Sequence, residues 1–246
     1  MSQWGFYFDQ SRCVGCKACV LACKNWNEER RGDASINVLD LVGYQVYEGQ
    51  PEKNSYIDET TGETNYSEYR KYYMKENWRR VETYDSGYTH INQTDNTFEF
   101  NIDRRYISLG CNHCDNPACV RACPVGAIHK EPDKGIVLVD SSVCISCGRC
   151  KTACAWGVPQ FYDDPGKYSI DDPKRPRMTK CTLCKDRIDV GLKPACVAAC
   201  WNRALQAGPI EQLKADNPDY VETLPDFKTD ESIGIKSEPN IIFKSK

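Results

Sequence analysis

The sequence predicts an α+β fold in which short helices and hairpins wrap four clusters of cysteines. Three observations lead to this prediction. The 246-residue chain holds 16 cysteines, and they fall into four tight groups of four. Leu, Ile, Val and Phe make up only about 19% of the residues, which is low for a chain with one large apolar core. Glycines and prolines interrupt the stretch between the first and second groups, which disfavours long helices there.

The four groups of cysteines have regular spacings. The first and third share C-x2-C-x2-C-x3-C, and the second is C-x2-C-x4-C-x3-C. In chain order, the groups are Cys13, Cys16, Cys19 and Cys23; Cys111, Cys114, Cys119 and Cys123; Cys144, Cys147, Cys150 and Cys154; Cys181, Cys184, Cys196 and Cys200. Four sets of four thiolates are what four 4Fe-4S clusters require, because each cluster takes four cysteine sulfurs.

The triplet C-x2-C-x2-C is typical of an iron-sulfur cluster, because a tight loop can place three thiolates around one face of the cluster. The next cysteine, four positions on, lies a helical turn away and can point to a second cluster. This is the bacterial ferredoxin run, in which the fourth cysteine binds the other cluster. The spacing therefore predicts modules that hold two clusters each.

Disulfides and zinc are the alternatives for so many cysteines. A disulfide scaffold is usually a short secreted chain with a signal peptide, whereas residues 1–10 have no basic segment and no long apolar stretch. Structural zinc sites use paired C-x2-C knuckles, often with histidine, and the only histidines are His90, His113 and His129. A zinc-stapled interaction module stays open as an alternative, and it predicts a colourless protein.

Composition also limits the partners. The formal net charge is −3, and four clusters with about two negative charges each would bring it to about −11. A surface of that sign disfavours nucleic acid. No run of 18 apolar residues occurs, so the sequence predicts no transmembrane helix. With so few large apolar residues, the clusters must serve as much of the core, and loss of iron should unfold the protein.

Motifs two and three lie close together and predict one complete two-cluster module. Between them lie a candidate hairpin at residues 124–128 and a buried strand at residues 136–139. Motifs one and four must then meet across the rest of the chain as a second module around the first.

With these motifs in place, the sequence resembles the four-cluster electron-transfer subunits of molybdopterin oxidoreductases, particularly those of the dimethyl sulfoxide reductase type. The resemblance lies in residues 11–19 (SRCVGCKAC), 111–119 (CNHCDNPAC), 144–150 (CISCGRC), 180–184 (KCTLC) and 193–196 (KPAC). All four motifs occur in the order found in the family, over residues 1–26 and about 106–210.

The resemblance implies which cysteines bind each cluster. The four implied sets are Cys13, Cys16, Cys19 and Cys200; Cys23, Cys181, Cys184 and Cys196; Cys111, Cys114, Cys119 and Cys154; Cys123, Cys144, Cys147 and Cys150. Some relatives have tryptophan at the position of Cys147 and hold a three-iron cluster, so this chain is expected to hold four irons there. The family often has proline after the last cysteine of a motif, whereas here only Cys123 is followed by one.

The resemblance also implies the function and the partners. No nucleophile motif, phosphate loop or substrate pocket is recognisable, so the chain is expected to be a non-catalytic conduit for single electrons. The implied partner is a large catalytic subunit with a molybdenum or tungsten pterin, joined by a quinol-oxidising membrane anchor subunit or a soluble electron donor. The complex would be cytoplasmic, exported through a twin-arginine signal on the partner, or membrane-associated through the anchor. A free polyferredoxin carrier and the iron-sulfur subunit of a formate dehydrogenase or hydrogenase complex are alternatives.

The predicted organisation has four parts. Two bacterial-ferredoxin-like modules around 4Fe-4S clusters comprise residues 1–26 with 176–210, and residues 106–175. Residues 27–105 form a β-rich, tyrosine-rich insertion, which is either a docking surface for the large subunit or a cap over the clusters. Residues 211–246 form an extended C-terminal tail, expected to be too irregular to fold alone and to lie along a partner.

Other residues near the cysteines have two interpretations each. Gly15 and Gly148 either let the backbone approach a cluster or are ordinary turn glycines. His113 is expected to support a site or lie on the surface rather than bind metal. Eight cations flank the motifs, where they would raise the potential of a cluster if buried and would be inert if solvated. They are Arg12, Lys17, Lys24, Arg149, Lys151, Lys180, Lys185 and Arg187.

Overall fold

The computed structural model of the chain describes all sixteen cysteines. It covers residues 2–27, 56–57, 64–65, 77–92, 97–161, 177–225, 227 and 236–246, with backbone alone for 56–57, 64–65, 88–92 and 97–101. Most tyrosines of the predicted insertion lie outside the described residues, so the choice between a docking surface and a cap is not tested for them.

The helices are short, and four of them begin at the same point of a cysteine motif. These are α1 (Ala18–Trp26), α4 (Ala118–Arg121), α5 (Arg149–Ala153) and α7 (Ala195–Ala198). Each starts one residue before the third cysteine of its motif, so that cysteine lies in the first turn. The last cysteine follows four residues later, about one turn of a helix further on. The x3 spacing is thus the spacing of a helical turn.

A three-stranded sheet joins the two ends of the chain, in the order β10-β1-β11. β1 (Trp4–Asp9) pairs antiparallel with β10 (Leu205–Pro209) and parallel with β11 (Ile241–Lys244). Because β1 leads into motif one and β10 follows motif four, this pairing brings the first and last motifs together. Helix α8 (Ile210–Asp216) follows β10 and packs against it.

Short antiparallel strand pairs make up three further sheets. β6 (Ile128–Lys130) pairs with β7 (Val137–Val139), which confirms the strand predicted between motifs two and three. β8 (Gln160–Phe161) pairs with β9 (Met178–Thr179), and β2 (Tyr56–Ile57) pairs with β3 (Thr64–Asn65). Short elements remain: helix α6 (Lys185–Ile188) and the 3-10 turns η1 (Gln10–Arg12) and η3 (Ser141–Val143).

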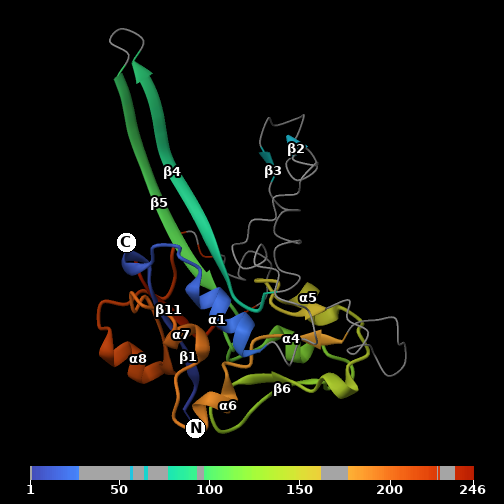
Figure 1. Cartoon of the computed structure of the whole chain (residues 1–246). Helices are drawn as coiled ribbons and strands as arrows, with labels where there is room; N and C mark the ends of the chain where they lie inside the picture. The colour runs from blue at the N-terminus through green and yellow to red at the C-terminus, as the bar shows by residue number, and fades with distance from the viewer. Residues whose placement is uncertain are drawn as a thin grey trace.

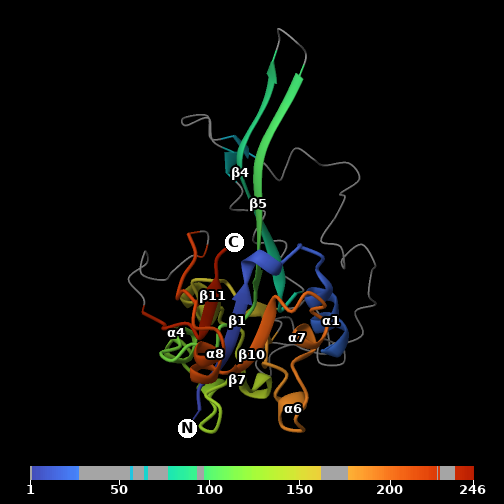
Figure 2. The same cartoon turned by 90° about the vertical axis from the view of Figure 1, so that its left-hand side faces the viewer.

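A long two-stranded ribbon extends from this body. β4 (Arg80–Asn92) and β5 (Thr97–Leu109) pair antiparallel along 13 residues each. The ribbon points away from the helices that carry the cysteines (Figures 1 and 2). This part of the insertion is β structure, and side chains at its base, such as Val81 and Ile107, pack in the core that contains the cysteines. It also crosses the predicted boundary at residue 105, because β5 continues to Leu109, which is buried in the body.

The described parts of the C-terminal tail form regular elements on their own chain, whereas contact of the tail with a partner stays a prediction. Ile241, Ile242 and Phe243 are buried in β11 beside β1. Just before β11, the tail pairs with the loop of motif two, where Asp115 N–H donates to Glu238 O (2.8 Å) and Asn240 N–H donates to Asn112 O (3.0 Å). The tail therefore ties β1 to motif two.

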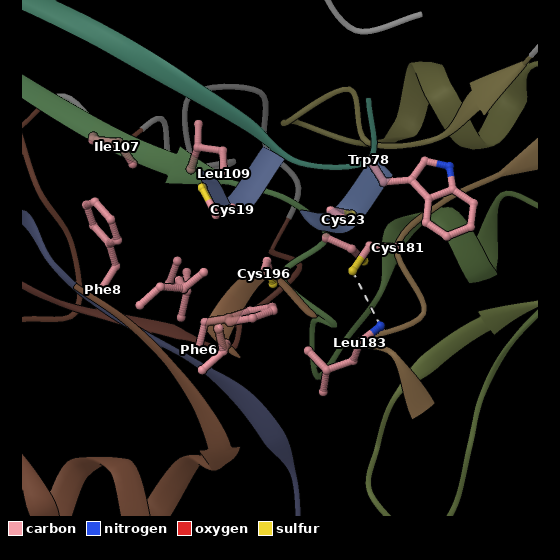
Figure 3. Close-up of a cluster of buried hydrophobic side chains, with 14 of the residues drawn as sticks. Phe6, Phe8, Cys19, Cys23, Trp78, Ile107, Leu109, Cys181, Leu183 and Cys196 are labelled. Carbon is pink, nitrogen blue, oxygen red and sulfur yellow. Dashed lines mark hydrogen bonds between the residues drawn. The ribbon is translucent and has the colours of Figure 1, made fainter. Parts of the chain in front are cut away.

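Cysteines are part of the apolar core. A large cluster of buried side chains joins Phe6 and Phe8 of β1 to Ile107 and Leu109 of β5 and to cysteines of motifs one, two and four, and the half-buried Cys154 of motif three packs against it. Figure 3 shows this region, with the cysteines interleaved among the aromatic and aliphatic side chains. A second cluster holds Cys144 and Cys150 with side chains of β6, β7 and β9. This arrangement agrees with a core that needs the metal clusters.

Candidate iron-sulfur sites

All four motifs begin with the same backbone turn. The second residue after the first cysteine has a positive φ in each: Gly15 (+68°), His113 (+45°), Ser146 (+57°) and Leu183 (+56°). Glycine adopts this conformation readily, whereas other residues adopt it at a cost. Sequence reasoning singled out Gly15 alone, although the shared C-x2-C spacing was the signal for the other three.

The turn directs backbone N–H groups towards sulfur. Ser146 N–H donates to Cys144 Sγ (3.4 Å), and Leu183 N–H donates to Cys181 Sγ (3.4 Å). Successive N–H groups in such turns form concave sites for anions. Hydrogen bonds of this kind to cluster sulfurs tune the reduction potential.

The first implied set of cysteines surrounds a single cavity. Cys13, Cys16, Cys19 and Cys200 line it, and its volume is about 380 Å³ when counted out to the opening to solvent. Three cysteines come from motif one and the fourth comes from the end of motif four. α1 and α7 pack against each other to bring them together. We call this the first site; its Cys16 is exposed.

The fourth implied set surrounds a second cavity of about 310 Å³, lined by Cys123, Cys144, Cys147 and Cys150. Here the triplet comes from motif three and the remaining cysteine from the end of motif two, and packing of α4 against α5 brings the two motifs together. Met178 N–H donates to Cys144 Sγ (3.5 Å) from β9. We call this the fourth site, and its Cys147 is exposed.

The second site comprises Cys23, Cys181, Cys184 and Cys196, which are all buried. Cys23 of α1 faces Cys181 and Cys196 across a short gap, as Figure 3 shows, and the dashed line there is the bond from Leu183 N–H to Cys181 Sγ. This set is supported by the placement of its side chains, which lie in one buried region or contact one another's charge.

The third site comprises Cys111, Cys114, Cys119 and Cys154, none of which is exposed. Burial raises the pKa of Cys114, and the neighbouring Cys111, Cys154 and Cys119 raise it further. Mutual repulsion of this kind shows that the four side chains lie close to one another. Lys180 adds a positive charge, with its Nζ 3.8 Å from Cys111 Sγ.

The donor set fits an iron-sulfur cluster at each site. All sixteen cysteines are free thiols. Burial is the main factor that raises the pKa of Cys13 to about 11 and of Cys196 to about 12. Such thiols ionise when a metal centre supplies positive charge. In the described ranges, no three His, Cys, Asp or Glu side chains lie close enough together to hold a single metal ion. At the first and fourth sites the thiols instead line cavities of about 380 and 310 Å³.

His113 supports the loop of motif two, which is one of the roles that the sequence allowed. Its side chain is fully buried, and its Nδ1 accepts a hydrogen bond from Val137 N–H (3.1 Å). Burial, followed by the charge of Lys180, holds its pKa well below the usual value. A neutral imidazole with Nδ1 as acceptor is therefore the form that fits this site.

The surroundings of Gly15 and Gly148, and the burial of the cations that flank the motifs, distinguish the interpretations that the sequence left open for these residues. A Cβ at Gly15 would overlap the ring of Tyr106, whereas nothing lies within 4 Å of a Cβ at Gly148. Of the eight flanking cations, only Lys24 and Lys180 are buried. A further buried cation, Arg79, escaped sequence reasoning because it lies far from any cysteine motif in the sequence.

The helices, hairpins and cysteine turns place the chain in the class of ferredoxin-type 4Fe-4S proteins. Residues 102–210 match the family model of a 4Fe-4S dicluster domain, and residues 4–25 match that of a 4Fe-4S binding domain. In the part of the chain that the structure describes, no helix is both long and apolar enough to cross a membrane.

Relatives that match over most of their length give a narrower classification. The chain is 33% identical to an anaerobic dimethyl sulfoxide reductase chain of Haemophilus influenzae, over 99% of this chain and 90% of the relative. It is 35% identical to the protein of the same name from Escherichia coli K12, over 91% and 82%. It is 35% identical to a sulfite dehydrogenase subunit of Allochromatium vinosum, over 85% and 70%. The protein belongs to the family of iron-sulfur electron-transfer subunits of dimethyl sulfoxide reductase-type molybdoenzymes.

Proposed function

We propose that the sixteen cysteines bind four 4Fe-4S clusters in the four sets described, and that the chain relays single electrons along them. The relay would run to or from a molybdenum or tungsten pterin in a partner catalytic subunit. The observation that carries this proposal is the make-up of the two cavities. Each is lined by a triplet from one motif and the last cysteine of another, which is the arrangement of two-cluster ferredoxins.

The four sites follow one another in a defined order. Burial raises the pKa of Cys196, Cys111 and Cys150, and a thiolate of an adjacent site raises each of them further. The three pairs that link neighbouring sites are Cys19 with Cys196, Cys111 with Cys181, and Cys119 with Cys150. These pairs connect the first site to the second, the second to the third and the third to the fourth. The order supports a single path for electrons.

The two ends of this path are the accessible ones. The first site has the exposed Cys16 and the fourth has the exposed Cys147, whereas neither inner site has an exposed cysteine. Electrons would therefore enter and leave through the first and fourth sites. A bound 4Fe-4S cluster supplies the one-electron chemistry. The cysteines hold the clusters, and the surrounding apolar side chains exclude water.

Exposed apolar side chains beside the first site support docking of the catalytic subunit there. Trp201 is 67% exposed, Val14 is 52% exposed, and both line the cavity of the first site. Tryptophan at a protein surface is enriched where proteins meet. The fourth site, with the exposed Val125 and Val143 near it, would then face a quinol-oxidising anchor subunit or a soluble donor.

Paired cysteine substitutions test the assignment. In anaerobically purified complex, Cys200→Ser and Cys16→Ser should alter the same cluster signal in electron paramagnetic resonance (EPR) spectra. Cys123→Ser and Cys147→Ser should together alter a different one. If Cys200→Ser instead changes the same signal as Cys184→Ser, each motif serves its own cluster and the proposed sets are wrong.

A free polyferredoxin carrier would share every cysteine, so purification distinguishes it. A subunit should copurify with a pterin-containing chain when isolated from its native source. Isolation of the chain alone, soluble and with all its iron, would favour the carrier.

A further inference from the structure

Arg79 is a buried cation that lies close to the cysteine sites. Its side chain is only 2% exposed, and its guanidinium lies 4.5 Å from the centroid of the Phe6 ring. Nη1 donates to Ser108 O (3.3 Å) and Ser108 Oγ (3.2 Å), while Nη2 is buried and has no hydrogen-bond partner among the described residues. No ion pair to an Asp or Glu of the described residues is formed. A buried charge normally requires compensation.

The groups that compensate Arg79 are cysteines. Burial acts to lower its pKa, but four thiolates act in the opposite direction and keep the pKa raised. Three of them, Cys23, Cys181 and Cys196, belong to the second site, and Cys19 belongs to the first. Ser108 extends this link, because its Oγ lies 3.3 Å from Cys19 Sγ. The Phe6 ring under the guanidinium belongs to the same buried cluster as Cys23, Cys181 and Cys196, which places Arg79 beside the second site, and the Ser108 contact with Cys19 links it to the first.

Lys180 occupies a similar place between the second and third sites. It is 1% exposed, and its Nζ contacts Val137 O, Cys181 O (3.0 Å) and Cys111 Sγ (3.8 Å). These are three acceptors, which match the three donors of an ammonium group. The side-chain nitrogen of Lys180 thus lies next to a ligand of the third site.

The two inner sites need such charges more than the outer ones. Reduction adds a negative charge to a cluster, and burial away from water disfavours that charge. The first and fourth sites each reach the surface through an exposed cysteine, whereas the second and third do not. Without compensation, the two inner clusters would be the hardest of the four to reduce.

We propose that Arg79 and Lys180 are fixed counter-charges that raise the reduction potentials of the two inner clusters, Arg79 for the second and Lys180 for the third. They are positioning residues that act through the electrostatic field and not by ligating iron. The inference rests on the proposed assignment of four clusters, and it adds the protein groups that set two of the potentials.

Redox titration of the anaerobic complex, followed by EPR, tests the role of Arg79. Arg79→Gln should shift the second cluster at least tenfold towards the oxidised form at a fixed potential, equivalent to a fall of 59 mV for a one-electron couple. Arg79→Lys keeps the charge, so the ratio of oxidised to reduced second cluster at that potential should stay within about threefold of the ratio in the unsubstituted complex. The Cys184→Ser variant identifies the signal of the second cluster.

Lys180→Gln and Lys180→Arg form the matching pair for the third cluster, whose signal Cys114→Ser identifies. Lys180→Gln should shift it at least tenfold towards the oxidised form, and Lys180→Arg should not. If Arg79→Gln loses iron, the Lys180 pair decides the test. Arg149→Gln is the control, because Arg149 is adjacent to Cys150 of the fourth site but is exposed. Solvent screening should limit the change in the ratio of oxidised to reduced fourth cluster to less than about twofold.

The outcomes separate the two proposals. Four cluster signals with unshifted inner potentials in both charge-removing variants would overturn the role of Arg79 and Lys180 alone. An equal shift in Arg79→Gln and Arg79→Lys would also overturn it, because that result indicates packing and not charge. Fewer than four cluster signals in the unsubstituted complex would contradict the cluster assignment itself.

Discussion

At the scale of single residues, the spacing of the cysteines determines which backbone conformations are needed. In each motif the second residue after the first cysteine has a left-handed backbone, because the C-x2-C turn closes around sulfur. Only motif one has glycine at this position. His113, Ser146 and Leu183 carry the conformational cost instead. At Gly15, the Tyr106 ring adds a steric reason for glycine.

Gly15→Ala should therefore be more damaging than Gly148→Ala. Both substitutions put a side chain at positive φ, which costs about 1 kcal/mol of unfolding free energy. At Gly15 the added Cβ must also displace Tyr106, which raises the cost to about 2–4 kcal/mol. Denaturant unfolding and iron content measure the difference, and equal losses in the two variants would show that the Tyr106 contact does not matter.

The cysteines could be predicted from the sequence, but the residues that act on them could not. The x3 spacing is local and reports a helical turn directly. Arg79 is brought to the second site by the base of the ribbon, and Lys180 differs from most of the other flanking cations in its burial. Contacts between segments far apart in the sequence decide both, and no pattern in the sequence records them.

At the scale of elements, the C-terminal tail is more regular than predicted. Its prolines suggested an irregular segment, and the four residues of β11 are too few to identify a strand. The strand forms because β1, at the opposite end of the chain, offers it a free edge. Parallel pairing of this kind joins distant segments, so the local sequence gives little indication of it.

Removal of residues 236–246 should disrupt the third site before the others. The tail holds the motif-two loop through backbone bonds to Asn112, Asp115 and Asn116. Redox titration should show loss of the third cluster signal, with lower iron content. Removal of residues 245–246 alone is the control, because these two residues are exposed and should leave all signals intact.

Phe243→Ala tests how much the tail stabilises the fold. Phe243 is fully buried and packs against Phe227 with ring centroids 4.8 Å apart. Truncation of a buried phenylalanine costs about 3–5 kcal/mol of unfolding free energy. A loss below about 1 kcal/mol in denaturant unfolding would show that the tail is only loosely attached.

The outer part of the ribbon of β4 and β5, residues 88–101, should be dispensable for cluster binding. A two-stranded ribbon is at best marginally stable in water alone, and its outer half extends away from the cysteines (Figure 2). Replacement of residues 88–101 by a two-residue turn should leave iron content unchanged and weaken copurification with the catalytic subunit. Loss of iron in this variant would instead assign the ribbon to the cluster-binding body.

At the scale of the whole molecule, metal and fold are coupled. Cysteines are interleaved with the aliphatic and aromatic side chains of both cores, and burial raises the pKa of many of these thiols. Anaerobic treatment with an iron chelator should therefore abolish the cooperative thermal transition in circular dichroism. Protein held anaerobically without chelator is the control, and an unchanged transition after complete iron loss would contradict this coupling.

The central claim is that the chain holds four 4Fe-4S clusters, and the metal content of the anaerobically purified protein tests it most directly. Sixteen cysteines in four sets predict about 16 irons per chain and no zinc. Fewer than about 12 irons, or zinc in stoichiometric amounts, would contradict the account.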